Sequence, residues 1–264
     1  MIVHQKGEFA EGYNAITAYE GPHADMQMDF GIIRLSAGTA YSNKEEKERA
    51  FLLIEGSVKL SWDGKEETVT RNSCFDENPI CLHVPKGMEV RFTGMADNTE
   101  ICCEAVHNDN VFEAKLYTQD MCVSDIFGKD ELGNTSIRTV RTVIDDSIAP
   151  YSNLVIGEVI NHPGKWSSYP PHHHVQPEVY HYRFLPETGF GVSIIGDQAE
   201  VIQHKSTSCV PGNLVHPQCS APGYAMYYIW LIPHTKEKRW LKDRTFDEKH
   251  TWMLQPDAKI WEPK

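Results

Sequence analysis

Short apolar or alternating runs follow one another along nearly the whole chain, and this repetition is the feature that most constrains the fold. Side chains that alternate with a period of two lie on opposite faces of a β-strand, so each run predicts a strand. Asp63-Gly64 between two runs suits the tight turn of a hairpin. Many short strands at close spacing predict an all-β protein built as a barrel or a sandwich. The runs are FGIIRLSAG, AFLLIEGSVKLSW, EETVTRNSCF, LHVPKGMEVRFTG, TEICCEAVH, NLVIGEVI, EVYHYRFL, GFGVSII, QAEVIQH and YAMYYIWLIP.

The runs fall into two similar halves. FLLIEGSVKL followed by HVPKGMEV in the first half resembles EVYHYRF followed by CVPGNLVHP in the second. Two repeats of a barrel of roughly 100 residues explain a chain of 264 residues better than one unusual fold. We therefore predict an N-terminal barrel over residues 1–110, a connecting segment over 111–150, and a C-terminal barrel with a packed tail over 151–264.

Composition and charge restrict the kinds of molecule that the protein is expected to bind. Hydrophobic residues make up 41% of the chain, which is enough for a packed core. The formal net charge of -12 repels nucleic-acid phosphates and anionic lipids, so we expect neither nucleic-acid nor membrane partners. No apolar run approaches the roughly 20 residues of a membrane-spanning helix, and the first residues lack the apolar region of a secretory signal. Seven cysteines without a C-x-x-C pair fit a reducing cytoplasm.

A histidine-rich segment in the second half carries the candidate chemistry. His172 and His174 share one face of a strand because they are two residues apart. Glu178 begins the next strand, and a hairpin brings it beside them. Further along, Pro211-Gly212 makes a turn that delivers His216. Three imidazoles and one carboxylate suit one divalent metal ion per chain, with zinc or manganese as first candidates and iron, cobalt or nickel as alternatives.

The same residues carry a resemblance to a known family. H-x-H-x₃-E followed by a Pro-Gly turn and a histidine resembles the two cupin motifs. WSSYPPHHH and EVYHYRF, with FGIIRL and HVPKG in the first half, resemble segments of the 5-deoxy-glucuronate isomerases of myo-inositol catabolism. The 4-deoxy-threo-hexosulose-uronate ketol-isomerases of pectin breakdown carry a similar His-x-His…Glu-Val-Tyr segment. The resemblance covers nearly the whole chain and implies two tandem cupin barrels, which are double-stranded β-helix jelly rolls, and thus a bicupin.

The resemblance also implies an aldose–ketose isomerase, an intramolecular oxidoreductase that converts 5-deoxy-D-glucuronate into 5-dehydro-2-deoxy-D-gluconate in inositol catabolism. The C2 proton of such a sugar is too weakly acidic to leave unaided, so a metal that binds the C1 carbonyl oxygen and the C2 hydroxyl would stabilise an enediolate. Alternation from Glu178 turns Tyr180 and Tyr182 toward the metal, and these three residues are the candidates for proton transfer.

A small anionic sugar acid is the expected partner, and its carboxylate requires a cation. Lys165, just before the WSSY segment, and Arg183 are the candidates for this contact. Alternation turns Arg183 away from the metal unless a β-bulge intervenes. Tyr169 is a candidate for the rim of the substrate site.

The first half retains the barrel pattern without the metal ligands. Arg49 occupies the position of the motif glutamate, and Val90 occupies the position of the histidine. We therefore expect the N-terminal barrel to be structural, or to form a wall of the site or a surface of a homo-oligomer.

Three alternatives stay open. Only Val175-Gln176-Pro177 separate the histidine pair from Glu178, where the inositol enzymes have a longer insertion, so the substrate could be another deoxy or keto sugar acid. The same fold hosts iron-dependent dioxygenases, which consume oxygen, whereas an isomerase does not. A non-enzymatic cupin that binds a sugar acid would leave its ligand unchanged.

Overall fold

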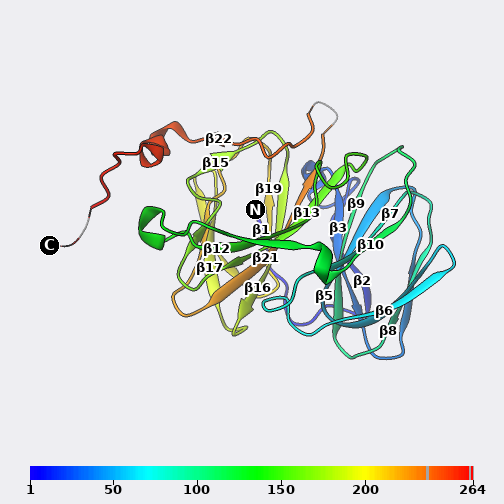
Figure 1. The fold of residues 1–264 in the computed structure, drawn as a ribbon. Helices are drawn as coiled ribbons and strands as arrows, with labels where there is room; N and C mark the ends of the chain where they lie inside the picture. Colours follow the sequence, from blue (N-terminus) through cyan, green and yellow to red (C-terminus); the bar gives the residue numbers. More distant parts are fainter. Residues whose placement is uncertain (236–237, 262, 264) are drawn as a thin grey trace.

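The chain forms two β-barrels that lie side by side, as the ribbon in Figure 1 shows. The structure is a computed structural model and describes residues 1–235, 238–261 and 263. The predicted all-β fold of two tandem barrels is confirmed. Within the described residues, no helix is long and apolar enough to cross a membrane. The short 3-10 helices are η1 (Ala24–Met26), η2 (Gln119–Met121), η3 (Leu132–Asn134) and η4 (Glu248–Leu254).

A nine-stranded sheet curls into the N-terminal barrel. Its strands are β2 (Gly12–Thr17), β3 (Asp29–Leu35), β4 (Ala40–Asn43), β5 (Glu48–Trp62), β6 (Lys65–Arg71), β7 (Ile80–Val84), β8 (Val90–Gly94), β9 (Thr99–Val106) and β10 (Lys115–Tyr117). The main order is β10-β7-β5-β9-β3-β2, and β4, β6 and β8 are attached through β5 and β8.

The long strand β5 takes part in both faces of this barrel. Its first part pairs with β7 and β9, and its second part pairs with β6 and β8. The register shifts between Leu53 and Glu55, and the strand then passes through Gly56 at a φ of 104°. A Cβ at Gly56 would lie 2.6 Å from Oγ1 of Thr99, so only glycine fits this bend.

The predicted hairpin after β5 is confirmed. Trp62 ends β5 and pairs with Lys65, the first residue of β6. Asp63 and Gly64 between them have φ values of 46° and 71°, as a type I′ turn requires.

Three sheets build the C-terminal barrel. Their strands are β1 (Ile2–Val3), β11 (Val123–Phe127), β12 (Arg138–Ile144), β13 (Leu154–Asn161), β14 (Trp166–Ser167), β15 (His172–His173), β16 (Glu178–Leu185), β17 (Phe190–Ile195), β18 (Gln198–Gln203), β19 (Thr207–Val210), β20 (Gln218–Ser220), β21 (Ala225–Pro233) and β22 (Thr245–Phe246). The orders are β1-β19-β16-β21-β13-β12-β11, then β14-β20-β17-β18, and the pair β15-β22.

The boundaries between the barrels differ from the predicted ones in two places. The first strand, β1, pairs with β19 and so belongs to the C-terminal barrel. The segment 111–150 is not a separate connection, because β10 joins the N-terminal sheet while β11 and β12 join the C-terminal sheet. Pairing between strands far apart in the chain decides these memberships, and local patterning does not contain it.

Apolar side chains form a cluster inside each barrel and a third cluster between the barrels. On β16, Tyr180, Tyr182 and Phe184 belong to the cluster inside the C-terminal barrel, whereas Val179 belongs to the cluster between the barrels. The predicted alternation along this strand is therefore confirmed. Both faces of the central strands are buried, which ties the barrels into one unit.

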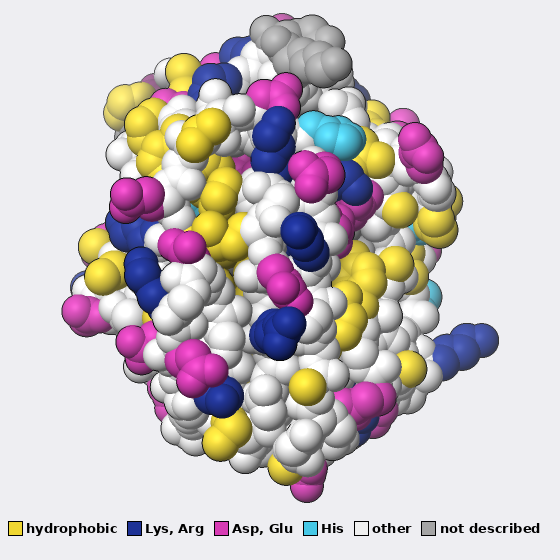
Figure 2. Space-filling view, turned by 90° about the vertical axis from the view of Figure 1, so that its right-hand side faces the viewer, with side chains coloured by type: hydrophobic (Ala, Val, Ile, Leu, Met, Phe, Trp, Pro, Cys, Tyr) yellow, Lys and Arg dark blue, Asp and Glu magenta, His cyan; other side chains and the backbone are white. Residues whose placement is uncertain are grey.

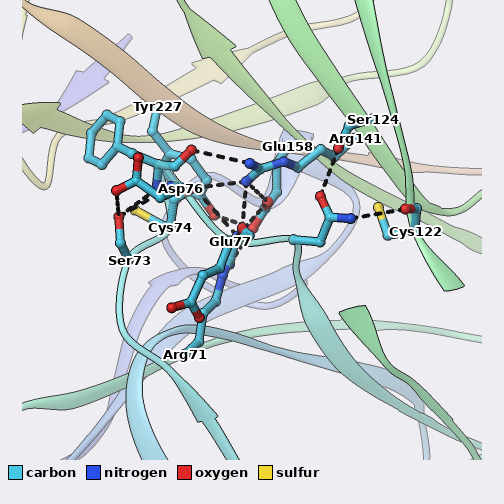
Figure 3. A network of polar contacts seen from close by, with 12 residues as sticks. Arg71, Ser73, Cys74, Asp76, Glu77, Cys122, Ser124, Arg141, Glu158 and Tyr227 are labelled. Atoms are coloured by element: carbon cyan, nitrogen blue, oxygen red, sulfur yellow. Dashed lines mark hydrogen bonds and ion pairs between the residues drawn. The ribbon is translucent and has the colours of Figure 1, made fainter. Parts of the chain in front are cut away.

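An ionic network also lies between the barrels, as Figure 3 shows. Glu158 on β13 is fully buried and accepts hydrogen bonds from Nη1 and Nη2 of Arg71, which ends β6, at 2.6 and 2.8 Å. Arg141 on β12 approaches the same carboxylate at 3.5 Å, and the hydroxyl of Tyr227 donates to it at 2.5 Å. A charge network thus joins β6 of one barrel to β13 of the other.

The outer face of the N-terminal barrel carries a mixed surface. Figure 2 shows Lys and Arg side chains interspersed with Asp and Glu, and hydrophobic side chains in patches between them. On this face of the described chain no continuous basic band is visible, which accords with the net charge of -12.

Candidate metal centre

Three elements of the C-terminal barrel bring the predicted metal ligands together. His172 lies on β15, Glu178 is the first residue of β16, and His216 lies between β19 and β20. The antiparallel pairing of β16 with β19 joins Glu178 to Val210, directly before the turn that leads to His216. The predicted hairpin between the histidine strand and the Glu178 strand is wrong, because β15 pairs with β22 and β16 pairs with β19 and β21. Glu178 reaches the histidines instead through the short loop after β15 and through the pairing of β16 with β19.

A close backbone approach holds the two histidine-bearing segments against each other. The amide of Asn213 donates to the carbonyl oxygen of His174 at 2.7 Å. Gly212 passes so near this loop that a Cβ would lie 2.1 Å from the carbonyl oxygen of Val175. A side chain at position 212 would push away the segment that carries His216, which explains the glycine of the turn.

The ligand atoms of His174, Glu178 and His216 lie within 4.8 Å of one another. Oε2 of Glu178 is 3.1 Å from Nε2 of His174 and 3.3 Å from Nε2 of His216. His172 stands beside this cluster, with its ring centroid 5.3 Å from that of His216. All four side chains are buried. The structure thus brings three of the predicted ligands into one cluster and places His172 at its edge.

Backbone carbonyls orient all three imidazole rings. Nδ1 of each ring donates to a carbonyl oxygen two residues away, at distances of 2.8 to 3.0 Å. A proton on Nδ1 leaves the lone pair on Nε2. In His174 and His216 the Nε2 atom faces the carboxylate of Glu178, so the arrangement is favourable only when a cation, either a proton or a metal ion, lies between ring and carboxylate. The donor set therefore fits a divalent metal, and hydrogen bonds of this kind orient histidine ligands in metal sites.

The electrostatics of the cluster favour the protonation states that bind metal. Burial acts to raise the pKa of Glu178, but its contacts with His174 and His216 outweigh burial and hold the pKa below its ordinary value. Burial lowers the pKa of His172 to about 3, and the charges of His216 and Arg244 act in the same direction. Glu178 is thus a carboxylate and His172 a neutral imidazole.

A cavity lined by aromatic, aliphatic and polar side chains opens onto the cluster. The rings of Tyr180 and Tyr228 meet edge to face with their centroids 4.9 Å apart. The hydroxyl of Tyr180 lies 3.2 Å from that of Ser168, and the hydroxyl of Tyr228 lies 2.5 Å from that of Ser167. Paired hydroxyls therefore stand next to the candidate metal ligands.

The tail after β21 forms one side of this cavity. Trp240 packs against Trp230 and His174, with ring centroids 5.7 and 6.2 Å apart. The pairing of β22 with β15 joins Phe246 to His172. Beyond η4 the described residues of the tail extend away from the barrel (Figure 1).

The two candidate tyrosines of β16 lie at different depths. Tyr180 lines the cavity, whereas Tyr182 lies deeper in the barrel and outside the cavity lining. The hydroxyl of Tyr182 donates to Oε1 of Gln218 at 2.5 Å and lies 2.8 Å from the hydroxyl of Ser208. These contacts make Tyr182 a buried structural residue, so we retain Tyr180 and Glu178 as the candidates for proton transfer.

The three expected substrate contacts do not reach the cavity. Arg183 faces the region between the barrels, where its guanidinium forms an ion pair with Glu100, because alternation along β16 turns it away from the metal ligands. Lys165 and Tyr169 lie outside the cavity lining, and the Tyr169 hydroxyl donates to Sδ of Met253 at 3.8 Å. The structure therefore does not support these assignments.

Two arginines that sequence reasoning missed line the cavity instead. Arg138 lies on β12, and Arg244 lies directly before β22. The alternating run RTVRTVI contained a usable signal for Arg138, because residues 138 and 141 of a strand face opposite ways. No local signal existed for Arg244, because it reaches the cavity through the pairing of β22 with β15.

Arg49 stands in the N-terminal barrel where Glu178 stands in the C-terminal one. Arg49 pairs with Val84 at the end of β7, Glu178 pairs with Val210 at the end of β19, and a proline follows each partner. The Arg49 guanidinium is buried and donates to Oδ1 of Asn43 at 2.7 Å and to backbone carbonyls. A cation bound into the barrel thus takes the place of the motif carboxylate.

The two barrels, with a buried histidine–glutamate cluster in the second, define the molecule as a bicupin. The chain belongs to the KduI/IolB family, whose model matches residues 1–253. The family expected from the sequence is therefore confirmed.

Relatives and solved structures match most of the chain. A 5-deoxy-glucuronate isomerase of Bacillus velezensis is 24% identical over 271 residues, which cover 95% of this chain and 97% of the relative. One from Geobacillus kaustophilus is 27% identical over 245 residues, with 86% and 85% covered. An IolB-like protein from Salmonella typhimurium LT2 has a TM-score of 0.85 at 21% identity, with 96% and 99% covered. An oxalate decarboxylase from Lactobacillus farciminis has a TM-score of 0.66 at 10% identity, with 94% and 88% covered. The cupin fold and the enzyme class, an isomerase, are thereby confirmed.

Proposed function

We propose that this chain is a metal-dependent aldose–ketose isomerase that converts 5-deoxy-D-glucuronate into 5-dehydro-2-deoxy-D-gluconate in inositol catabolism. The convergence of His174, Glu178 and His216, with both rings oriented by backbone carbonyls, is the observation that carries the proposal. Membership of the KduI/IolB family and the names of the relatives support the substrate.

His172, His174, Glu178 and His216 would hold one divalent ion, with zinc or manganese as the first candidates. When bound, this ion would polarise the C1 carbonyl and C2 hydroxyl oxygens of the open-chain sugar and lower the energy of the enediolate.

The side chains of the cavity would move the protons. In this reaction one proton leaves C2 and one is added at C1, while a hydroxyl proton passes from O2 to O1. Glu178 contacts the histidines through Oε2, which leaves Oε1 as the candidate acceptor for the C2 proton and its donor to C1. The hydroxyl of Tyr180 is the candidate for the proton transfer between O2 and O1.

We also propose that the enzyme is a cytoplasmic homo-oligomer that acts on a small anionic sugar acid and has no nucleic-acid or membrane partner. Its seven cysteines are free, which fits a reducing compartment. The edge strand β11 exposes Val123, Ile126 and Phe127, apolar groups that a second copy of the chain would cover. Light scattering that finds only a particle of 30.0 kDa at assay concentration would exclude the oligomer.

Incubation of metal-loaded protein with 5-deoxy-glucuronate in D₂O without oxygen, followed by proton NMR, tests the activity. Conversion to the keto acid supports the isomerase, and deuterium at the former C1 shows exchange of the transferred proton with solvent. No conversion by fully metal-loaded protein contradicts the proposed substrate. A reaction that begins only when oxygen is admitted identifies a dioxygenase, and unchanged sugar retained by the protein identifies a binding protein.

Replacement of a single ligand tests the metal centre. His216→Ala should lose the metal and the activity while its circular dichroism stays that of the wild type, because His216 is not part of an apolar cluster. His250→Ala, in the tail segment η4, is the matched control and should keep both. Full metal content in His216→Ala, measured by mass spectrometry of the eluted metal, would refute the ligand assignment.

A further inference from the structure

We infer that Arg138 and Arg244 bind the carboxylate of the substrate at the mouth of the metal cavity. The inference rests on the proposed function, because it concerns which end of a sugar acid this cavity recognises. Both side chains line the cavity that also contains His172 and Glu178. They reach it from two separate elements, the start of β12 and the segment directly before β22.

Arg138 is a partly buried cation that contacts no carboxylate among the described residues, and its guanidinium carbon lies 5.9 Å from the ring centroid of Phe127. Its Nη1 donates to the carbonyl oxygen of Ser136 at 2.8 Å, and among the described residues it forms no ion pair. Burial lowers the pKa of Arg138, and the nearby charge of Arg244 acts in the same direction. The acidic group that acts on Arg138 from a distance is Glu131, an exposed residue. Two close cations without a carboxylate disfavour each other, and a bound anion would relieve both.

Two arginines buried between the barrels contrast with Arg138. Arg141 shares the carboxylate of Glu158, and Arg183 forms an ion pair with Glu100. Arg49, in the N-terminal barrel, also has no carboxylate partner among the described residues, but its guanidinium donates to Asn43 and to backbone carbonyls. Arg138 and Arg141 lie on the same strand but face opposite ways. The unmatched charge is therefore a property of the cavity face of β12, whereas the region between the barrels supplies carboxylates for its arginines.

Arg244 is held at the rim of the cavity by the tail. The register of β22 with β15 joins Phe246 to His172, and their ring centroids are 5.9 Å apart. Asp243, the preceding residue, pairs with Lys238 at 2.7 Å, so this neighbouring carboxylate is already matched by a cation. The guanidinium of Arg244 therefore stands beside a candidate metal ligand with its charge directed to the cavity and the solvent.

The chemistry of the cavity fits an acid better than a neutral sugar. A guanidinium donates two parallel hydrogen bonds to a carboxylate. A substrate whose C1 and C2 oxygens lie at the metal position would extend its other end along the cavity. In a sugar acid that other end is a carboxylate. Glu178 is the acidic residue of the lining and is committed to the histidines. The cavity is thus locally positive in a protein whose net charge is -12.

Two polyols that cannot isomerise test this inference by calorimetric titration of metal-loaded protein. One is the C1 alcohol of 5-deoxy-glucuronate, which keeps the carboxylate, and the other is 5-deoxyglucitol, in which CH₂OH replaces it. We expect the wild type to bind the acid more tightly. Arg138→Met should weaken binding of the acid by about 10- to 100-fold and leave binding of 5-deoxyglucitol unchanged. Arg138→Lys should lose less, because lysine keeps the charge without the planar fork.

Two more variants complete the experiment, one at Arg244 and one at Arg91, which lies on the N-terminal barrel. Arg244→Met should weaken binding of the acid about two- to fivefold, as expected for a solvent-exposed ion pair. Because Arg244 is exposed, this variant also tests the inference if Arg138→Met does not fold. Arg91→Met, on the N-terminal barrel with 68% of its side chain exposed, is the control and should bind both polyols like the wild type.

The outcomes separate this inference from the proposed function. Equal losses for both polyols in Arg138→Met, or no loss for the acid, would overturn the arginine assignment. A wild type that converts 5-deoxy-glucuronate but binds both polyols equally would keep the function and refute the inference. If the wild type does not convert 5-deoxy-glucuronate but binds the acid more tightly than 5-deoxyglucitol, and Arg138→Met abolishes this preference, the proposed function is refuted and the carboxylate site is supported.

Discussion

Replacement of Glu158 by glutamine should cost the protein a large part of its stability. The carboxylate is fully buried between the barrels and accepts hydrogen bonds from Arg71 at 2.6 and 2.8 Å and from Tyr227 at 2.5 Å (Figure 3). Burial acts to lower the pKa of Arg71, but Glu158 outweighs burial and raises the pKa, so the guanidinium stays charged. In Glu158→Gln the Arg71 and Arg141 guanidinium groups remain buried without their counter-charge.

A buried charge left without its partner costs about 3–5 kcal/mol of unfolding free energy. For a chain of this size, that loss lowers the melting temperature by roughly 6–20 °C. Arg71 belongs to the N-terminal barrel and Glu158 to the C-terminal one, and an apolar cluster fills the space between the barrels. Both barrels should therefore lose stability in one transition, observed by urea unfolding and by calorimetry.

Matched variants isolate the ionic contribution. Glu66→Gln removes an exposed carboxylate 3.6 Å from Lys59 and should change the unfolding free energy by less than about 0.5 kcal/mol. Arg71→Met combined with Glu158→Leu should cost less than the sum of the single changes, because no charge in the pair is then left alone. A loss below about 1 kcal/mol in Glu158→Gln would refute the view that this network joins the barrels.

Two further predictions concern the two tyrosines of β16 and a buried acid. Tyr180→Phe should lower kcat by about 100-fold at unchanged metal content, because its hydroxyl lines the cavity. Tyr182→Phe should retain most of kcat but lose about 1–3 kcal/mol of unfolding free energy, because its hydroxyl is buried and hydrogen-bonded to Gln218. Equal losses of kcat in the two variants would contradict the different depths of the two hydroxyls. Burial, together with the charge of Glu48, raises the pKa of Glu104 well above its ordinary value, and neither carboxylate oxygen has a hydrogen-bond partner among the described residues. The folded protein thus keeps a proton that the unfolded chain releases, so stability falls as pH rises above the ordinary glutamate pKa. Glu104→Gln should therefore raise the urea midpoint more at about pH 8 than at about pH 5, and an unchanged pH slope would refute this.

Local patterns were sufficient to predict those features that depend on neighbouring residues in the chain. The direction of a side chain in a strand follows from a period of two, so Glu178, Tyr180 and Tyr182 could be assigned to one face and Arg183 to the other. The φ values required by Asp63 and Gly64 follow from the turn itself. The spacing of His174 and Glu178 is equally local, whereas His216 joins them through the pairing of β16 with β19.

Only the tertiary structure decided features that depend on residues far apart in the chain. Strand register and barrel packing place Tyr182 below the cavity and β1 in the C-terminal barrel. They also bring Arg183 into an ion pair with Glu100. The cavity cations Arg138 and Arg244 come from two elements that meet only after folding. By itself the sequence determined the strands, the faces of their side chains and the ligand motif, because periodicity and turn geometry are local. The depth of each group and the charge partner it meets were decided by the fold, because pairing between distant strands sets both.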